Sequence, residues 1–200
     1  MNILTLVLGD FRTNCYLVSD ENGDTAVIDP GYTPEAILAA ARERGLTIRA
    51  VLLTHGHFDH VGGVKGIAEA AHCPVYVNER DTALPAELNH GLTATDFYGD
   101  GDGDSVRVGT LRFSVSETPG HTPGSVCLRC GNALFSGDTL FAGCCGRTDL
   151  SGGSDVQMQS SLSRLAAIDE NLTVYPGHGP ATTLSLEKQT NPYLRRAGRL

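Results

Sequence analysis

Hydrophobic positions along the chain fall into short runs, separated by polar turns, that alternate with stretches of helical spacing. Apolar runs at residues 1–8, 15–18 and 25–28 have the length and composition of β-strands. A Pro-Gly turn then leads to a helix, because the apolar residues that follow share one helical face. We expect Thr33 to cap this helix and Gly45 to end it.

The rest of the chain continues the alternation. A near-continuous apolar run at 48–53 predicts a strand buried on both faces. Further strands are predicted at 74–77, 111–115, near 126, near 134 and at 173–175, and further helices at 61–71, at 155–166 and from 185. We expect Ser154 to cap the helix at 155–166. Without a linker or a short repeat, the pattern predicts one α/β domain over residues 1–200.

Residues 92–104 are rich in Gly and Asp and show little periodicity, which predicts a loop. Within them Asp100, Asp102 and Asp104 alternate with glycines. This alternation does not complete a calcium-loop pattern, so we expect a solvated loop without an ion.

Charge and composition narrow the class of partner. The 200 residues include 15 Lys and Arg against 23 Asp and Glu, a formal charge of −8. This sign disfavours nucleic acid and anionic membrane surfaces, so a small-molecule partner is expected. No apolar run is long enough to span a membrane. The apolar N-terminal segment lacks the basic region and cleavage site of a secretory signal, which favours the cytoplasm and free thiols for the six cysteines.

The densest chemical signal is Thr54-His55-Gly56-His57-Phe58-Asp59-His60, directly after the predicted strand at 48–53. Imidazole and carboxylate are ligand types for zinc and other divalent transition metals. Side chains in a loop at a strand end can fan out toward two adjacent metals. Because several ligand types cluster here, a metal site is favoured over a polar turn with incidental histidines.

Three later segments each add one residue of ligand type where a predicted strand ends. His121 lies between two Pro-Gly turns, Asp138 follows the strand near 134, and His178 lies in Tyr175-Pro176-Gly177-His178-Gly179. Singly, each is consistent with an ordinary polar turn. Together with the first cluster they predict a metal centre assembled from four segments.

These motifs resemble the metallo-β-lactamase fold superfamily, and most of all its small glyoxalase II-like hydrolases. The resemblance covers almost the whole chain. Besides the HxHxDH cluster and the three later ligands it rests on Ile28-Asp29-Pro30-Gly31, Ser136-Gly137-Asp138-Thr139-Leu140-Phe141, Gly146-Arg147-Thr148-Asp149, Tyr175-Pro176-Gly177-His178-Gly179 and Thr190-Asn191-Pro192. It implies a four-layer αββα sandwich with a two-metal site at one edge. His72 and His90 match no motif position and are predicted to lie on the surface.

The resemblance also implies how the ligands divide between two divalent metal ions. The implied ligands are His55, His57 and His121 for the first ion, Asp59, His60 and His178 for the second, and Asp138 as a bridge between both. Asp59 and Asp138 are also the implied catalytic residues. Zinc is the expected metal, with iron and manganese as alternatives, because all three accept His and Asp.

The implied chemistry is hydrolysis. Two ions that share a water lower its pKa from about 15.7 toward about 7, and the resulting hydroxide attacks an acyl carbonyl. If the substrate is a thioester, its leaving thiolate, with a pKa of ~8.5, needs little protonation, so no separate general acid is required. The resemblance therefore implies a thioesterase of the hydroxyacylglutathione hydrolase type, acting on S-lactoylglutathione or a similar acyl thioester.

Arg147 occupies the loop position at which glyoxalase II enzymes place a basic residue against glutathione. Two roles are open for it: binding a substrate carboxylate, or bonding to carbonyls of its own loop or to Asp149. Two departures from the family pattern put the glutathione specificity in doubt. Gly179-Pro180 follows His178 where the longer enzymes carry an aromatic, and the chain ends at Leu200 without their helical substrate domain.

Other readings of the same residues stay open. Persulfide dioxygenases share this fold and a similar GRTD segment but use one iron, for which His57, His121 and Asp138 would serve. The full set of seven dinuclear ligands favours hydrolysis over this reading and over a metal-storing or regulatory module. The charge of −8 disfavours a nuclease of the same superfamily. Cys144 and Cys145 are expected to be small structural residues rather than redox groups or ligands.

Overall fold

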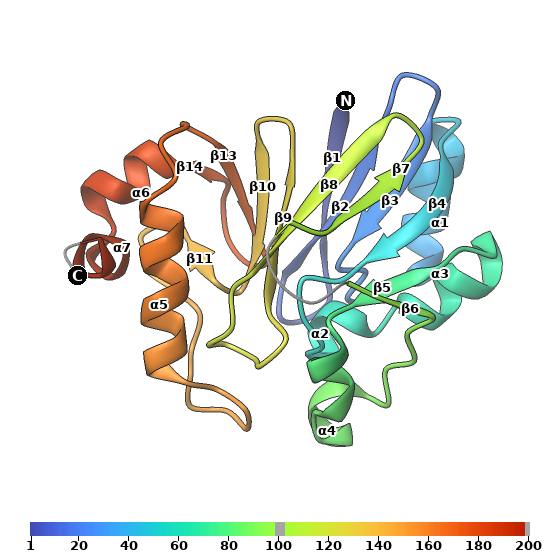
Figure 1. Ribbon diagram of the computed structural model, residues 1–200. Coiled ribbons are helices and arrows are strands. Elements are labelled where there is room, and N and C mark those ends of the chain that lie inside the picture. The colour runs from blue at the N-terminus through green and yellow to red at the C-terminus, as the bar shows by residue number, and fades with distance from the viewer. Residues whose placement is uncertain (99–102, 199–200) are drawn as a thin grey trace.

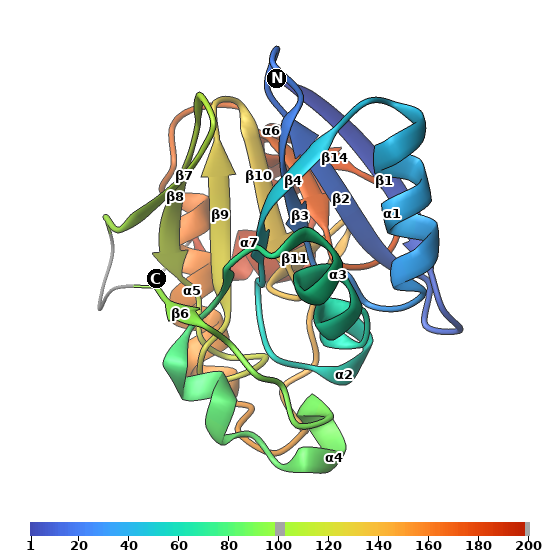
Figure 2. The ribbon, with the colours of Figure 1, turned by 90° about the vertical axis from the view of Figure 1, so that its right-hand side faces the viewer.

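Two β-sheets lie face to face, and helices cover the outer face of each (Figures 1 and 2). The arrangement is that of a computed structural model, which describes residues 1–98 and 103–198. Each of the two sheets has six strands, and a two-stranded hairpin forms a third, smaller sheet. No helix of the described residues is long and apolar enough to cross a membrane.

The first sheet combines antiparallel pairing among β1, β2 and β3 with parallel pairing from β3 to β6. In spatial order its strands are β1 (Asn2–Leu8), β2 (Thr13–Ser19), β3 (Asp24–Ile28), β4 (Thr47–Leu52), β5 (Val75–Val77) and β6 (Asp96–Phe97).

The second sheet is antiparallel from β7 to β10, and β13 pairs with β10 in parallel. In spatial order its strands are β14 (Thr182–Thr183), β13 (Thr173–Pro176), β10 (Ala133–Gly137), β9 (Val126–Cys130), β8 (Leu111–Glu117) and β7 (Ser105–Val108). The hairpin consists of β11 (Leu140–Phe141) and β12 (Cys144–Cys145).

Alternate residues of each strand face opposite layers, because successive side chains of a strand point to opposite faces of its sheet. Tyr16 and Val18 of β2 lie in the core between the sheets, whereas Leu17 faces the helices outside. Phe113 and Phe135 enter the same central core from the second sheet. Each sheet therefore has two buried faces, one against the other sheet and one against the helices.

The outer layers differ in their helices. α1 (Pro34–Glu43) and α3 (Val64–Ala71) pack on the first sheet, while α5 (Asp155–Ala166), α6 (Leu184–Thr190) and α7 (Pro192–Ala197) pack on the second. Three further helices are short: α2 (Phe58–Val61) lies between β4 and α3, and the 3-10 helix η1 (Glu79–Ala83) and α4 (Ala86–Asn89) lie between β5 and β6. Helix, sheet, sheet and helix layers confirm the predicted αββα sandwich.

Several local predictions need correction. The helix expected at 61–71 is two helices, α2 and α3, separated at Gly62 and Gly63, where the Gly63 amide donates to the Pro30 carbonyl at 2.7 Å instead of continuing the helix. Thr33 makes no side-chain capping bond, and its φ of 51° is left-handed. Ser154 does cap α5, accepting from the Gln157 amide.

Two further differences concern the middle of the chain. The loop expected at 92–104 includes the strand β6, which adds to the edge of the first sheet. Asp100 and Asp102 of the proposed solvated loop lie outside the described residues, and β7 was not predicted. The remaining predicted strands and helices are present near their expected positions.

Candidate metal centre

The predicted ligands gather where the C-terminal ends of several strands meet, near α2 in the lower centre of Figure 1. The loop after β4 holds His55 and His57, and Asp59 and His60 lie in the first turn of α2. His121 is in the turn between β8 and β9. Asp138 directly follows β10, and His178 follows β13. The fold thus brings together all seven residues from four separate segments.

His55, His57 and His121 form the first group, with one donor atom of each lying within 4.8 Å of the others. His57 Nδ1 lies 2.8 Å from His121 Nε2. His121 Nδ1 lies 2.8 Å from the carbonyl oxygen of Arg147, which can only accept, so Nδ1 carries the proton. Nε2 of His121 is therefore left with a lone pair directed at the group.

Asp59, His60 and His178 form the second group under the same distance limit. His178 Nε2 lies 3.2 Å from Asp59 Oδ2 and 3.4 Å from His60 Nε2. The Thr13 hydroxyl donates to Asp59 Oδ2 at 3.0 Å. The Phe11 carbonyl, which can only accept, lies 3.1 Å from His178 Nδ1, so Nδ1 carries a proton.

Asp138 lies between the two groups. Its Oδ2 is 3.4 Å from His121 Nε2 of the first group and 3.5 Å from His178 Nε2 of the second. Its Oδ1 is 3.4 Å from His60 Nε2. Gly177 is needed beside it, because a side chain at this position would collide with Asp138 Oδ1 and His60. This carboxylate has the placement of a bridge between two ions.

Asp29 is a further functional residue, for which the sequence pattern predicts no role although it lies in the motif Ile28-Asp29-Pro30-Gly31. The Asp29 side chain is buried, and its Oδ2 lies 3.0 Å from His60 Nδ1. It also accepts from the Thr54 amide at 2.8 Å and from the Thr54 hydroxyl at 2.7 Å. Asp29 therefore orients His60 and the start of the ligand loop.

Burial and charge act on the histidines in opposite directions. Burial, followed by the neighbouring imidazoles, lowers the pKa of His57 to about 4 and that of His55 well below its ordinary value. Burial also opposes protonation of His60, but the carboxylates of Asp138 and Asp29 outweigh it and raise the pKa of His60. Burial thus favours the neutral forms of His55 and His57, whereas His60 of the second group is coupled to carboxylates.

The carboxylates are ionised in the same environment. Burial would raise the pKa of Asp59, but hydrogen bonds from His178 and Thr13 and the charge of His60 lower it. Burial of Asp138 is likewise outweighed by His60, so that its pKa is lowered. Carboxylate oxygens and imidazole nitrogens are the donor types that divalent transition metals accept.

Unpartnered atoms show that this donor set fits metal ions. Nε2 of His55, Nε2 of His57 and Oδ1 of Asp138 are buried and take part in no hydrogen bond. An unpaired buried polar group costs about 1–3 kcal/mol. A cation held by these lone pairs would remove that cost, so the residues present fit a dinuclear metal centre.

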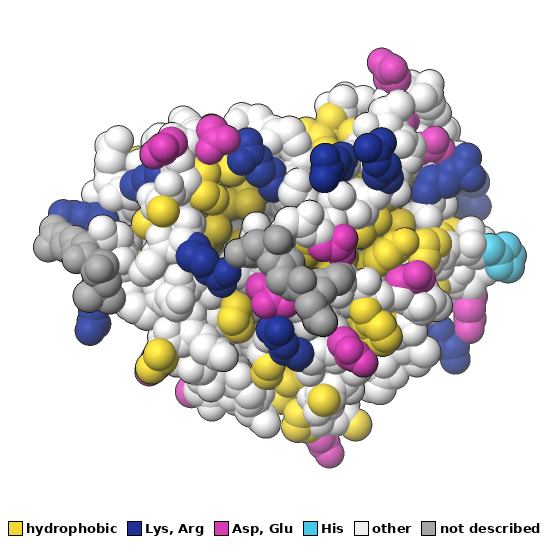
Figure 3. All heavy atoms as spheres, viewed as in Figure 1, with side chains coloured by type: hydrophobic (Ala, Val, Ile, Leu, Met, Phe, Trp, Pro, Cys, Tyr) yellow, Lys and Arg dark blue, Asp and Glu magenta, His cyan; other side chains and the backbone are white. Residues whose placement is uncertain are grey.

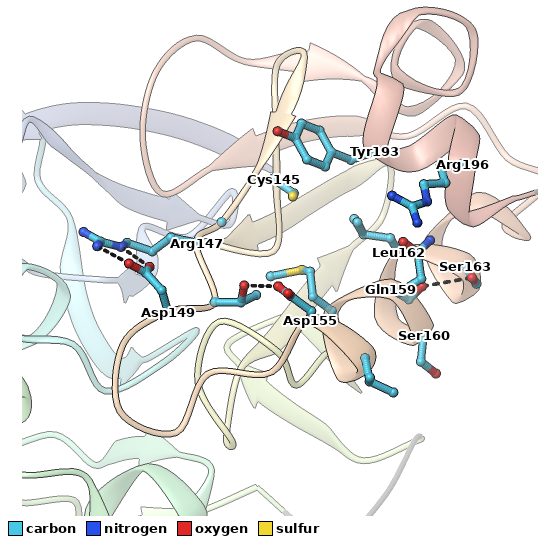
Figure 4. A pocket seen from close by; sticks show the side chains of 14 residues that line it. Cys145, Arg147, Asp149, Asp155, Gln159, Ser160, Leu162, Ser163, Tyr193 and Arg196 are labelled. Carbon is cyan, nitrogen blue, oxygen red and sulfur yellow. Dashed lines mark hydrogen bonds and ion pairs between the residues drawn. The ribbon is translucent and has the colours of Figure 1, made fainter.

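A cavity of about 970 Å³ adjoins this centre (Figure 4). Gly146 belongs to both, because it lines the cavity and packs against Asp138 and His121. Arg147 lines the cavity as well, and its exposed guanidinium bonds to Asp149 at 2.6 and 2.7 Å. The bond to Asp149, one of the two roles left open for Arg147, is therefore present. Arg196 on α7 lines the same cavity and forms no ion pair with another described residue.

The remaining histidines and the cysteines belong to neither donor group. His72 and His90 are exposed, as predicted, and His90 stacks on Phe58. All six cysteines are free. Cys144 and Cys145 form β12, and Cys145 lines the cavity beside the hairpin.

Comparison with known proteins shows to which family the chain belongs. Residues 8–178 match the Metallo-beta-lactamase superfamily. Hydroxyacylglutathione hydrolase GloC of Haemophilus influenzae is 32% identical over 208 residues, which are 97% of this chain and 98% of GloC. The probable metallo-hydrolase YqgX of Bacillus subtilis is 37% identical over 202 residues, 94% of either protein.

Solved structures agree with this match. The B3 metallo-β-lactamase BLEG-1 has a TM-score of 0.88 at 33% identity, covering 96% of this chain and 99% of its own. TTHA1623 in a di-iron-bound form has a TM-score of 0.84 at 38% identity, covering 95% and 99%. ETHE1 from Myxococcus xanthus has a TM-score of 0.82 at 32% identity, covering 99% and 85%. With its αββα layers, its clustered histidines and aspartates and these relatives, the chain belongs to the metallo-β-lactamase superfamily.

Proposed function

We propose that this protein is a dinuclear metal-dependent hydrolase of acyl thioesters, of the glyoxalase II type, with S-lactoylglutathione or a similar compound as substrate. The observation that carries the proposal is the position of Asp138 between two complete groups of donor atoms. The similarity to a hydroxyacylglutathione hydrolase over nearly the whole chain supports the same reaction class.

In this proposal the first group would hold one divalent ion and the second group the other, with the Asp138 carboxylate available to both. Zinc is the proposed metal, and the similarity to a di-iron protein keeps iron as an alternative. When bound, two such ions supply a hydroxide near neutral pH and polarise an acyl carbonyl.

The protein residues prepare the centre for that reaction. The Thr13 hydroxyl donates to Asp59 Oδ2 at 3.0 Å and His178 Nε2 lies 3.2 Å from the same oxygen, and these contacts favour the ionised form of Asp59. Backbone carbonyls of Arg147 and Phe11 keep protons on Nδ1 of His121 and His178. These contacts fix the donor atoms before substrate arrives, which lowers the cost of reorganisation during the reaction.

The cavity beside Gly146 is the proposed site for the thiol portion of the substrate. Arg147 is bound to Asp149, but both side chains are more than 60% exposed, and such surface pairs contribute only about 0–1 kcal/mol. A substrate carboxylate can therefore replace Asp149 at Arg147. Arg196 offers a second guanidinium across the same cavity (Figure 4).

The partner class and compartment follow from surface charge and thiols. Basic and acidic side chains are interspersed on the face drawn in Figure 3, which supports a small-molecule substrate over nucleic acid or an anionic membrane. Six free cysteines support a reducing compartment, and we propose the cytoplasm.

A second candidate is a mononuclear iron persulfide dioxygenase. The close approach of His57 to His121, and of His121 to Asp138, would supply two histidines and one aspartate for a single iron. The second donor group would then have no ion to hold.

The test is the metal content of the purified protein together with thiol release from S-lactoylglutathione without oxygen. Two ions per chain with rapid thiol release is the expected result. One iron per chain, no thiol release, and oxygen consumption with a glutathione persulfide would replace the proposal with the dioxygenase. His72→Ala serves as a matched histidine control, because His72 is exposed and belongs to neither donor group.

A further inference from the structure

The carboxylate of Asp81 is buried against the loops that hold the first donor group, and it belongs to none of the motifs on which the family resemblance rests. Asp81 is in η1, after β5, and its side chain is fully buried. It is 25 residues from Gly56 and 41 residues from Thr122 in the sequence. The fold nevertheless places it against both loops that hold His55, His57 and His121.

Three donors from these two loops converge on Asp81. The amide of Gly56, the residue between His55 and His57, donates to Oδ2 at 2.8 Å. The Thr122 hydroxyl donates to the same oxygen at 2.7 Å. The amide of Gly124 donates to Oδ1 at 2.6 Å.

The two glycines make this approach feasible. A Cβ atom at Gly56 would lie 3.0 Å from Asp81 Cβ, and one at Gly124 would lie 2.6 Å from Asp81 Oδ1. Side chains at either position would push the loops away from the carboxylate. Gly56 and Gly124 are thus both needed because they let the two ligand loops approach Asp81.

Only a carboxylate can serve all three donors, because it has two acceptor oxygens and no donor. Within the described part of the chain Asp81 forms no ion pair with Lys or Arg. Burial raises the pKa of Asp81, which expresses the cost of keeping a charge there. Three short hydrogen bonds to a charged acceptor offset that cost.

We propose that Asp81 is a positioning residue that holds the loop of His55 and His57 in register with the loop of His121, and thereby sets the metal affinity of the first donor group. The proposal rests on the metal centre but not on the thioesterase activity. It stands if the substrate turns out to be different.

The test compares Asp81→Asn with the unmodified chain. An asparagine amide has one acceptor oxygen, so its NH2 group opposes at least one of the three donors however it is turned. Loss of a group that orients ligands typically costs about 10- to 100-fold in metal affinity. We expect this loss in zinc affinity at His55, His57 and His121, and a smaller change at His60 and His178. Long-range 1H–15N NMR spectra of the histidine rings during a zinc titration report each ring separately.

Asp20→Asn is the matched control. Asp20 is also buried and accepts from two backbone amides, Asn22 and Asp24, and from the amide and hydroxyl of Thr110, but it contacts neither ligand loop. We expect this variant to lose stability without a change in the ratio of zinc affinities between the two groups. Undiminished affinity at the first group of Asp81→Asn, or an equal loss at both groups, would overturn the proposal.

A milder pair of variants covers the case in which Asp81→Asn does not fold. Thr122→Val removes one donor to Asp81, and Thr122→Ser keeps the hydroxyl. We expect Thr122→Val to weaken zinc binding at the first group several-fold and Thr122→Ser to restore it. Equal affinities in these two variants would count against Asp81 as the positioning residue.

Discussion

The carbonyl oxygen of Arg147 lies 2.8 Å from Nδ1 of His121, while the Arg147 side chain lines the neighbouring cavity. The backbone of one residue thus orients a candidate metal ligand, and its side chain faces the proposed substrate site. A substitution changes only the side chain, so these two contributions can be separated by experiment.

Arg147→Ala is expected to raise KM for S-lactoylglutathione without changing the metal content. A hydrogen bond to a charged group contributes about 1.5–3 kcal/mol, which corresponds to roughly 10- to 100-fold in kcat/KM. Steady-state kinetics and metal analysis of the same preparation measure both quantities. Asp149→Ala is the companion variant, since it removes the competing carboxylate and should lower KM or leave it unchanged. Metal loss in Arg147→Ala would show that the side chain supports the centre itself.

Asp138→Ala and His57→Ala are expected to lose both metal and turnover. Asp138 contacts both donor groups, so its loss should reduce the metal content toward zero, whereas His57→Ala should affect the first group most. We expect turnover to fall by at least about 100-fold in each, because the proposed hydroxide requires bound metal. His72→Ala should match the unmodified protein in both measurements. Normal activity in Asp138→Ala would exclude the metal-hydroxide reaction.

Much of the fold could be predicted because its strands show apolar and polar residues in alternation, which is visible in the local sequence. The strand that ends at Glu117 has apolar residues at every second position, and the structure buries that face between the sheets. The candidate ligands were predictable for a related reason. They lie in dense motifs directly after strands, where the chain must turn.

Features that depend on distant contacts could not be predicted. Asp81 resembles any acidic residue of a turn, and only the folded structure brings it to Gly56 and Gly124. The break at Gly62 likewise depends on the close passage of Gly31. The cavity combines α5, α7 and β12, which are separated along the chain, so no single segment carries a signal for it.

Asn191→Ala is expected to destabilise the protein more than an ordinary cap deletion. Asn191 Oδ1 caps α7, and its Nδ2 donates to the Cys144 carbonyl at 2.9 Å, which ties the C-terminal helices to the β11–β12 hairpin. Losing a cap costs about 1 kcal/mol, and losing the bonds of the amide to the Cys144 carbonyl and to the buried Glu187 Oε2, at 2.9 Å, adds about 1–3 kcal/mol, so the free energy of unfolding should fall by about 2–4 kcal/mol. Ser154→Ala, which removes only the α5 cap, should cost about 1 kcal/mol by urea denaturation. Equal losses would mean that the bond to the hairpin contributes nothing.

Phe113→Ala tests the packing of the two sheets. Phe113 is fully buried between them, with its ring centroid 6.5 Å from that of Phe135, so removing the ring leaves a cavity that neighbouring strands cannot close. Such truncations cost about 3–5 kcal/mol. Val156→Ala is the control, because Val156 is 81% exposed and its truncation should change stability by less than about 0.5 kcal/mol. If the urea midpoint of Phe113→Ala falls while the dependence of the unfolding free energy on urea concentration stays the same, the substitution has changed the stability. If Phe113→Ala cost under about 1 kcal/mol, the Phe113 ring could not be packed in the core between the two sheets as described.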